Sequence, residues 1–557
     1  MPETNMAITS LLVVLKFLMI LFSAGWVLLW LLKPTEVWTR KWKEAEESAT
    51  ATVFGYNGLN FAVYTFPVIA LAMAGIIYLE LTRKEPRSRQ TRSPAKALSN
   101  PLIVNSYLGV ISAIEILTVL LFILSLAWTF YSRVSNDFNK MVPMKNLKLN
   151  TWQYKSYRVS ISGSLPSTAS SAYSEGLAIF QLLGVQFEAS VRYHVWLGTT
   201  MILFAFLHGA GNIFMWGKTG RIYLAGEITL VTGLVIWITS LPQIRRKKFE
   251  VFYYTHHLYI VFLLFFLFHG GDRHFYTVFA GIFLFSLDKL FRIIQSRPET
   301  CIVAARIFPC KAIELILPKD PRLVYTPTST IFIKIPSIST LQWHSFSISS
   351  SSNIDEHTMS VIIRCDGWWT SSLYSLVQAG PGSHDKQMKC LPVAVEGPYG
   401  PASLDFLRYD SLLLIAGGIG ITPLLSILHE IDSIRNGSIG RFPAQVQLIY
   451  VVKKSQDICL LDSVLPLLLK QASEQFHPKV KVFVTQEQSS ATKGEILDEF
   501  SRIETTNFDR QYSNYAPQKI GNSLFVAAIV GFSSIMFIIL LSLLQPCFSS
   551  HGQEEGL

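Results

Sequence analysis

Two apolar stretches that each carry histidines near both ends constrain this chain more than any other feature. The first runs from Tyr193 to His208 and the second from Tyr254 to His269, and neither contains a charged residue. A single histidine in an apolar helix is more often a packed, hydrogen-bonded side chain than a ligand. Histidines at matching depths on two such helices point to a functional site instead, because imidazole groups buried in lipid are energetically expensive.

The spacing of these histidines indicates how they could act together. His194 and His208 are 14 positions apart, which brings their rings to within roughly 40° of one helix face. His256 and His269 are 13 apart, or roughly 140° around an ideal helix, so the second helix needs a bend or local unwinding. The two levels would lie ~20 Å apart and could hold two b-type hemes, with one histidine from each helix at each level. Spacing alone does not choose between His256 and His257.

The composition indicates a chain with membrane-spanning segments. Half of the 557 residues are apolar and 15% are charged, which is too apolar and too long for one soluble domain. The net charge of +10 would suit a nucleic-acid partner, but basic residues cluster beside apolar stretches, at 83–92 and 245–248. The positive-inside rule predicts such clusters, so we expect a lipid bilayer, and no nucleic acid, as partner.

Several further stretches are long and apolar enough to span a bilayer. The run from about Met6 to Leu32 exceeds a signal-peptide core and lacks a small-residue cleavage pattern, so it is predicted to be a retained span. Charged side chains inside spans are often functional, but snorkelling and pairing between helices explain Lys16 and Asp288 better. The other predicted spans are Asn60–Leu81, Tyr107–Tyr131, Tyr193–Trp216, Ile222–Leu241, Phe252–Gly270, Phe275–Phe291 and Asn522–Leu544, with Glu115 and Glu227 as further charges.

The pattern changes from Pro298 to about Ile520. Short apolar runs such as Thr330–Ile335 and Met359–Arg364 alternate with serine, glycine and proline, which predicts a small β-barrel. After Pro401 the order becomes strand, glycine turn and helix, which is typical of an α/β nucleotide-binding unit. The strand is 412–416, the turn is Gly417–Gly420 and the helix continues through Leu428, with further strands at Gln445–Val452 and Lys479–Thr485.

The cysteines carry no recognisable pattern. Six are scattered at positions 301, 310, 365, 390, 459 and 547, and none forms a Cys-x-x-Cys. Neither a zinc site nor a disulfide framework is therefore expected.

Four short motifs follow one another in the second half of the chain. Each alone is a weak signal, since serine-rich strand ends and Gly-Gly-x-Gly turns often bind nothing. In the last motif, however, a glycine turn joins a strand to a helix and presents backbone N–H groups that favour phosphate. All four motifs occur in order after the helices with the paired histidines. Such a combination rarely arises by chance. They are Trp343–Ser349 on a strand of the barrel, Gly367–Thr370, Glu396–Gly400 and Ala416–Pro423.

With these motifs the chain resembles plant ferric-chelate reductases, the ferric reduction oxidase family, within the group that includes superoxide-producing NADPH oxidases. The resemblance covers nearly the whole chain apart from Tyr157–Gln186 and the extreme C-terminus. It implies a multi-pass α-helical membrane bundle, similar to a di-heme ferric reductase, followed by a cytosolic ferredoxin-reductase-like module with FAD-binding and NAD(P)-binding parts. Arg192–Gly198, Leu224–Glu227, Tyr254–His256 and Ala416–Pro423 carry it most closely.

The resemblance also implies roles for single residues. His194, His208, His256 and His269 fall on the family's heme positions, so they would bind the iron of two b-type hemes. His344, Phe346 and Ser347 fall on the FAD motif, with Ser345 where many relatives have proline. From the next two motifs we take Gly367, Thr370 and Gly397 as further cofactor-binding candidates. Gly417, Gly418, Gly420, Thr422 and Pro423 fall on the loop for NADPH or NADH.

We therefore expect six regions along the chain. They are N-terminal transmembrane helices at 1–136, an irregular loop in place of an expected helix at 137–190, the di-heme domain at 191–297, the FAD-binding barrel at 298–403, an incomplete NAD(P)-binding unit at 404–520 and a C-terminal transmembrane helix at 521–547.

The predicted activity is electron transfer from cytosolic NAD(P)H through FAD and two hemes to ferric chelates on the opposite side. One alternative is a superoxide-generating NADPH oxidase with the same cofactors and O₂ as acceptor. Glu227 favours iron, since a carboxylate near the outer surface could attract ferric species, although a hydrogen bond between helices would also explain it. A second alternative is a truncated, inactive membrane subunit. The plasma membrane is the default location, with a mitochondrial or plastid membrane open, and the choice of NADH or NADPH, the natural chelate and the oligomeric state stay undecided.

Two departures from the family generate a prediction about activity. With the soluble half in the cytosol, the topology requires one crossing between Ser132 and Ala189, yet no convincing span lies there. The resemblance also implies a later nucleotide-domain segment, which we expect to be missing after Cys547. We therefore expect the 557-residue chain to reduce ferric chelates far more slowly than a chain with both segments restored. Expression of the two side by side in reductase-deficient cells tests this, and equal activity would contradict it.

Overall fold

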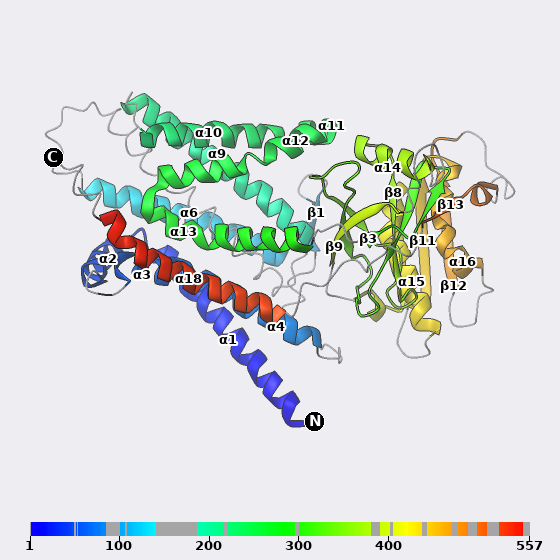
Figure 1. Ribbon diagram of the computed structural model, residues 1–557, viewed down its shortest axis with the longest axis horizontal. Helices are drawn as coiled ribbons and strands as arrows, with labels where there is room; N and C mark the ends of the chain where they lie inside the picture. Colours follow the sequence, from blue (N-terminus) through cyan, green and yellow to red (C-terminus); the bar gives the residue numbers. More distant parts are fainter. Residues whose placement is uncertain are drawn as a thin grey trace. The chain divides into compact units, whose positions relative to one another are not determined.

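The computed structural model forms two compact units, residues 1–288 with 521–557 and residues 289–520. Helices dominate the first unit, and strands with covering helices form the second (Figure 1). The structure describes residues 2–49, 52, 54–84, 101–105, 109–140, 187–216, 221–295, 300–379, 390–400, 405–436, 443–469, 477–487, 498–508 and 523–549.

The N-terminal helices pack against one another through apolar side chains. Leu15 and Met19 of α1 are buried against Leu71 and Ala74 of α4. The ammonium nitrogen of Lys16 lies 5.6 Å from the ring centroid of Tyr78, so the interhelical pairing predicted for this charge is confirmed. The elements are α1 (Pro2–Leu32), α2 (Glu36–Ala49), α3 (Gly55–Asn60), the π-helical turn η1 (Phe61–Thr65) and α4 (Phe66–Lys84).

The next predicted span begins later than expected. Strands β1 (Pro101–Asn105) and β2 (Gly109–Ser112) pair as an antiparallel hairpin, and α6 runs from Ala113 to Lys140. The Ser112 N–H donates to Glu115 Oε2 at 2.6 Å, and the Glu115 N–H donates to Ser112 Oγ at 3.3 Å. This reciprocal capping box starts the helix at Ala113, so the predicted start at Tyr107 was wrong and Glu115 has a capping role.

Of the two helices that carry the paired histidines, the second is broken, as its histidine spacing requires. The second histidine-bearing helix is interrupted at His257 and Leu258, which form a turn. Further on, Gly271 adopts φ 63° and ψ −174°, so the boundary predicted between two spans falls at a kink. The elements are α9 (Phe187–Trp216), α10 (Arg221–Thr239), α11 (Pro242–Lys247), α12 (Phe249–His256) and α13 (Tyr259–Gln295).

The last helix, α18 (Ser523–Ser549), packs within the helical unit. The ring of Phe537 stacks on Phe279 with centroids 4.1 Å apart, and Val530 is buried beside Trp26 and Tyr276. In the described parts of the chain, three helical segments are long and apolar enough to cross a membrane, and four are apolar but shorter. The long ones are Ile8–Leu32, Gly55–Thr82 and Phe249–Gly271; the shorter ones are Glu115–Thr129, His194–Ala210, Tyr223–Thr239 and Phe525–Leu540.

The irregular loop predicted at 137–190 is only partly described. Residues 137–140 end α6 and residues 187–190 begin α9, so both pieces are helical rather than irregular. The expected missing crossing concerns residues 141–186, which lie outside the described residues.

The second unit begins with the predicted barrel of antiparallel strands. Its two four-stranded sheets have the orders β13-β4-β5-β8 and β3-β9-β6-β7. Both sheets contribute to one core, in which Ile313, Leu315, Ile331 and Ile333 are fully buried. The elements are β3 (Thr300–Cys301), β4 (Ala304–Phe308), β5 (Ala312–Pro318), β6 (Thr330–Lys334), β7 (His344–Ser347), β8 (Thr358–Arg364), α14 (Trp368–Ala379), β9 (Pro392–Tyr399), η5 (Asp405–Arg408) and β13 (Glu504–Asn507).

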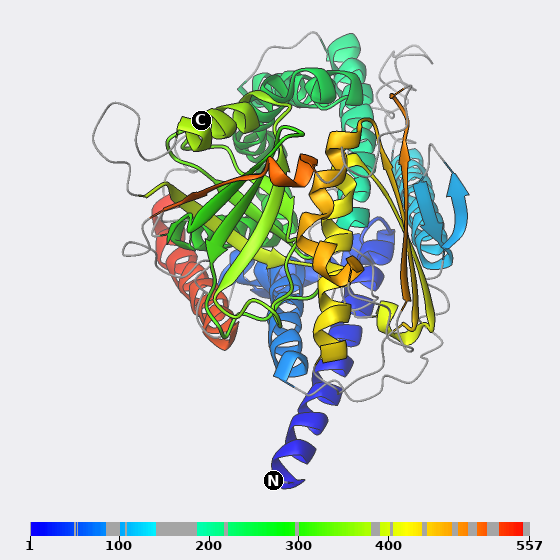
Figure 2. The same cartoon turned by 90° about the vertical axis from the view of Figure 1, so that its right-hand side faces the viewer.

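The remaining strands form the predicted α/β unit. Three parallel strands have the order β10-β11-β12, and α15 lies between this sheet and the barrel (Figure 2). A shared core joins the two parts, because Phe308 and Ile362 of the barrel are buried with Leu425 of α15 and Leu448 of β11. The elements are β10 (Ser411–Gly417), η6 (Gly418–Ile421), α15 (Thr422–Asn436), β11 (Gln445–Val452), η7 (Ser455–Val464), α16 (Leu465–Leu469) and β12 (His477–Val484).

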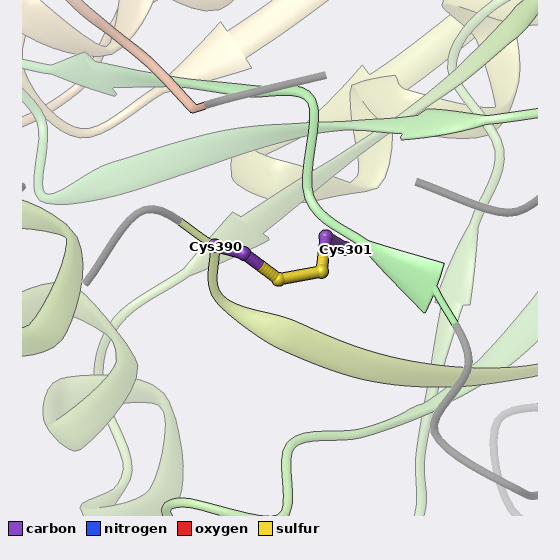
Figure 3. The surroundings of a disulfide bond; sticks show 2 residues. All are labelled: Cys301 and Cys390. Atoms are coloured by element: carbon purple, nitrogen blue, oxygen red, sulfur yellow. A yellow bond between two sulfur atoms is a disulfide. The ribbon is translucent and has the colours of Figure 1, made fainter. Parts of the chain in front are cut away.

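A disulfide bond joins Cys301 to Cys390 (Figure 3). Strand β3 pairs with β9 so that Cys301 lies opposite Pro392, which brings the two cysteines together although 89 positions separate them. The expectation that the cysteines form no disulfide was therefore wrong for this pair. Short-range spacing could not reveal a bond that depends on the pairing of distant strands.

The barrel core yields a stability prediction. Leu315 is fully buried and Leu341 is 64% exposed, so the same truncation should act very differently at the two sites. Leu315→Ala should lower the free energy of unfolding by about 2–5 kcal/mol, whereas Leu341→Ala should change it by less than about 0.5 kcal/mol. Melting of the detergent-purified chain measures both, and equal melting temperatures for the two variants would contradict the barrel core.

Candidate functional site

The four predicted heme ligands meet in two pairs between neighbouring helices. The ring centroids of His194 on α9 and His256 on α12 are 6.2 Å apart. Those of His208 on α9 and His269 on α13 are 5.9 Å apart. The structure therefore combines one histidine from each helix at each level, as the sequence predicted.

The separations within the pairs fit a metal with two axial imidazoles. With a metal–nitrogen bond of about 2 Å on each side, the centroids of two opposing rings lie roughly 6 Å apart. His194 is exposed and His208, His256 and His269 are half-buried. Both pairs thus have the spacing and the donor atoms that a b-type heme requires.

The turn after α12 decides which of two adjacent histidines joins the inner pair. His256 ends α12 and faces the ring of His194. His257 lies in the turn, where its Nδ1 is 2.8 Å from the carbonyl oxygen of Tyr253 and its ring contacts Tyr253 and Tyr259. His256 is therefore the candidate ligand, which spacing alone left undecided.

The predicted flavin motif forms an aromatic surface on an edge strand. His344 and Phe346 share one face of β7, the last strand of its sheet, and both are half-buried. Trp369 of α14 packs against both, with centroids 4.4 Å from His344 and 6.1 Å from Phe346. Trp369 lies within the Gly367–Thr370 motif, but its contact with this strand could not be predicted from the motif. Strand alternation places Ser347 on the opposite face, so it does not join this surface.

The second motif forms the beginning of a helix beside that surface. The Gly367 N–H donates to Thr370 Oγ1 at 3.0 Å, and that hydroxyl donates to the Gly367 carbonyl at 3.1 Å. These bonds close the first turn of α14, whose N-terminal N–H groups favour an anion. Because Trp369 in the same turn contacts His344, an aromatic surface and an anion-binding helix end adjoin. This donor set fits the ring and the pyrophosphate of FAD.

The third motif is held by an ion pair and a close strand contact. Glu396 is buried, pairs with Arg292 and accepts a hydrogen bond from the Tyr399 hydroxyl at 2.5 Å. Gly397 has φ 124°, and a Cβ there would lie 3.2 Å from the carbonyl oxygen of Thr330. Gly397 therefore allows β9 to approach β6, and its proposed cofactor contact stays a prediction.

The glycine loop lies between β10 and α15 as predicted. Gly418 has φ 51°, a conformation that favours glycine, and the Tyr450 hydroxyl donates to its carbonyl at 3.1 Å. Burial raises the pKa of Tyr450, so that hydroxyl keeps its proton. A Cβ added at Gly418 or Gly420 would meet nothing within 4 Å, which leaves room for a phosphate at the helix N-terminus. Thr422 is buried and donates to the Ile419 carbonyl at 3.2 Å.

Three family models match successive parts of the chain. A ferric reductase like transmembrane component matches residues 173–267, an FAD-binding domain matches 299–403 and a ferric reductase NAD binding domain matches 409–535. The first match includes His194, His208 and His256 and ends two residues before His269. The third extends into α18, which packs in the helical unit.

Similar proteins cover the chain almost completely. Ferric reduction oxidase 8, mitochondrial, of Arabidopsis thaliana is 48% identical over 99% of this chain and 79% of its own length. That alignment runs over 584 positions, more than the 557 residues here, so the relative has residues with no counterpart in this chain. Probable ferric reduction oxidase 1 of the same plant is 34% identical over 95% of this chain and 79% of its length.

A more distant relative covers less of the chain. A superoxide-generating NADPH oxidase heavy chain of Dictyostelium discoideum is 31% identical over 38% of this chain and 32% of its own length. Three domain models match the chain in order, and relatives above 30% identity align along nearly its whole length. Together these matches identify the protein family. The chain belongs to the ferric reduction oxidase family.

Proposed function

We propose that the chain is a transmembrane ferric-chelate reductase that moves electrons from NAD(P)H to ferric chelates across a membrane. The proposal depends mainly on the two histidine pairs. The ring centroids are 6.2 Å apart in the inner pair and 5.9 Å apart in the outer pair. They lie in a membrane-type helical unit of a chain that also matches FAD-binding and NAD-binding domain models.

Each part of the chain has a defined task in this proposal. His194 with His256, and His208 with His269, would hold the iron of two b-type hemes. The surface of His344, Phe346 and Trp369 would support the flavin ring, and the N-terminus of α14 would hold the pyrophosphate. When bound, FAD takes up two electrons as hydride and releases them singly, and heme carries single electrons.

The glycine loop would orient the hydride donor. Gly418 and Gly420 leave open space at the N-terminus of α15, where the pyrophosphate of NAD(P)H would bind. Reaction requires donor and flavin within ~3.5 Å, so the shared core of barrel and α/β unit would keep the two sites in register.

The share of the chain that aligns with each relative favours ferric iron over O₂ as the electron acceptor. Ferric reduction oxidases 8 and 1 align over 99% and 95% of the chain, whereas the superoxide-generating relative aligns over 38%. Glu227 is exposed on α10 and follows Gly226, where an added Cβ would meet His269, so we propose that this carboxylate attracts ferric species to the outer level.

One comparison separates the candidate functions. Membranes containing the chain, supplied with NADPH, should reduce a ferric chelate faster than they form superoxide. Superoxide as the main product would support the oxidase instead, and hemes that NADPH does not reduce would support the inactive membrane protein. Because two relatives, ferric reduction oxidases 8 and 3, are named mitochondrial, we propose a mitochondrial membrane alongside the plasma membrane, and fractionation against markers of both tests this.

The ligand assignment predicts the heme content of variants. His208→Ala should remove the outer heme and leave much of the inner one, so heme per protein should fall from about two to about one. His257→Ala is the matched control, since its ring contacts Tyr253 and Tyr259, and it should keep both hemes. Pyridine hemochrome assays on purified protein measure the ratio, and an unchanged ratio and spectrum for His208→Ala would overturn the assignment.

The flavin assignment predicts a separate loss. His344→Ala removes one aromatic contact, worth about 0.5–1.5 kcal/mol, so FAD should be held roughly two- to tenfold more weakly while heme stays bound. His357→Ala, at an exposed position of the same barrel, should retain FAD normally. Flavin fluorescence after rebinding gives the affinities, and normal FAD binding by His344→Ala would show that the barrel site is misassigned.

A further inference from the structure

We propose that α10 and the residue after it, which supply no predicted iron ligand, orient the two ligands on the α12 and α13 side. Gly226 acts at the outer pair and Ser240 at the inner pair. This inference rests on the proposed function, because it takes His256 and His269 as heme ligands.

The spacing on α10 matches the two levels of ligands. Gly226 and Ser240 are 14 positions apart, as are His194 and His208. Fourteen positions return to nearly the same helix face at levels ~20 Å apart. One helix can therefore reach both histidine pairs from the side.

At the outer level the important property of Gly226 is its lack of a side chain. A Cβ at this position would lie 2.7 Å from both Cε1 and Nδ1 of His269, which is closer than non-bonded atoms tolerate. The ring occupies the space that any other residue would fill. Gly226 therefore fixes how close the His269 ring lies to α10, and so where its other edge points.

At the inner level Ser240 acts through its hydroxyl. Ser240 Oγ donates its proton to the Ile236 carbonyl at 2.6 Å, so its lone pairs remain available as acceptors. His256 Nδ1 lies 3.4 Å from this oxygen. We infer that Nδ1 carries the proton and donates it to Ser240, which leaves Nε2 with the lone pair that iron requires.

The hydroxyl contact has a consequence for the inner heme. An acceptor at Nδ1–H makes an imidazole a stronger electron donor to its metal, which stabilises ferric over ferrous iron. Loss of the acceptor should raise the midpoint potential of the inner heme. It should also weaken the binding of that heme about tenfold, the lower limit of the typical effect of such contacts on metal affinity, and so speed its release.

Ser240→Ala tests this with a matched neighbour. Thr239 accepts a hydrogen bond from Thr255 at 2.8 Å, so Thr239→Val removes a hydroxyl between the same two helices without touching His256. In the full chain in detergent, Ser240→Ala should raise one of two heme potentials and speed heme transfer to apomyoglobin. Thr239→Val should leave both potentials unchanged, and Ser240→Thr should keep the wild-type values.

Gly226→Ala tests the outer level. Gly233 on the same helix is equally crowded, since a Cβ there would lie 2.7 Å from Ile202 Cδ1, and its next nearest atoms belong to Phe262 rather than to a histidine. Gly226→Ala should change the low-spin paramagnetic resonance signal of one heme and leave the other unchanged. Gly233→Ala should change neither signal.

The outcomes separate this inference from the proposed function. If the wild-type chain binds two hemes but Ser240→Ala and Gly226→Ala leave potentials and signals unchanged, the role of α10 is wrong and the ligand assignment stands. If the wild-type chain shows no heme with two histidine ligands, the proposed function fails first. If Gly226→Ala and Gly233→Ala change the resonance signals equally, the contact between Gly226 and His269 is ordinary helix packing and does not orient the ligand.

Discussion

The interruption of the helix between His256 and Tyr259 is the feature on which the candidate heme site depends. An unbroken helix would turn His256 and His269 roughly 140° apart, and only one could face α9. The turn keeps its backbone groups satisfied, since the Leu258 N–H donates to the Thr255 carbonyl at 3.0 Å and the Ile260 N–H donates to the His257 carbonyl at 3.2 Å. Such hydrogen bonds are essential at membrane depth, and these two are kept at the break in the helix.

Features set by neighbours in sequence were predictable. The histidine spacing required a break in the second helix, and the order of strand, glycine turn and helix located Gly418 before α15. The late start of α6 was also readable, because Ser112 and Glu115 have the spacing of a capping box, but the apolar run upstream hid it. These properties depend on periodicity and local hydrogen bonding, and both are determined within short stretches of the sequence.

Features set by packing between distant segments were not predictable. The Cys301–Cys390 bond depends on the pairing of β3 with β9, and the position of Trp369 beside His344 depends on how α14 lies against β7. The contacts of Gly226 and Ser240 with the histidines require knowing which helices are neighbours. A glycine and a serine in an apolar helix give no sign of such roles by themselves.

The core shared by the barrel and the α/β unit limits how this module can move. Besides the buried apolar contacts, Glu430 of α15 accepts hydrogen bonds from Ser351 and Asn353 of the barrel at 2.7 and 2.8 Å, and Arg364 pairs with Asp457. Separating the two parts would expose this core and leave Glu430 without these partners. A hinge-like opening is therefore disfavoured, and entry of the nicotinamide ring must rely on local rearrangements smaller than a rotation of whole lobes.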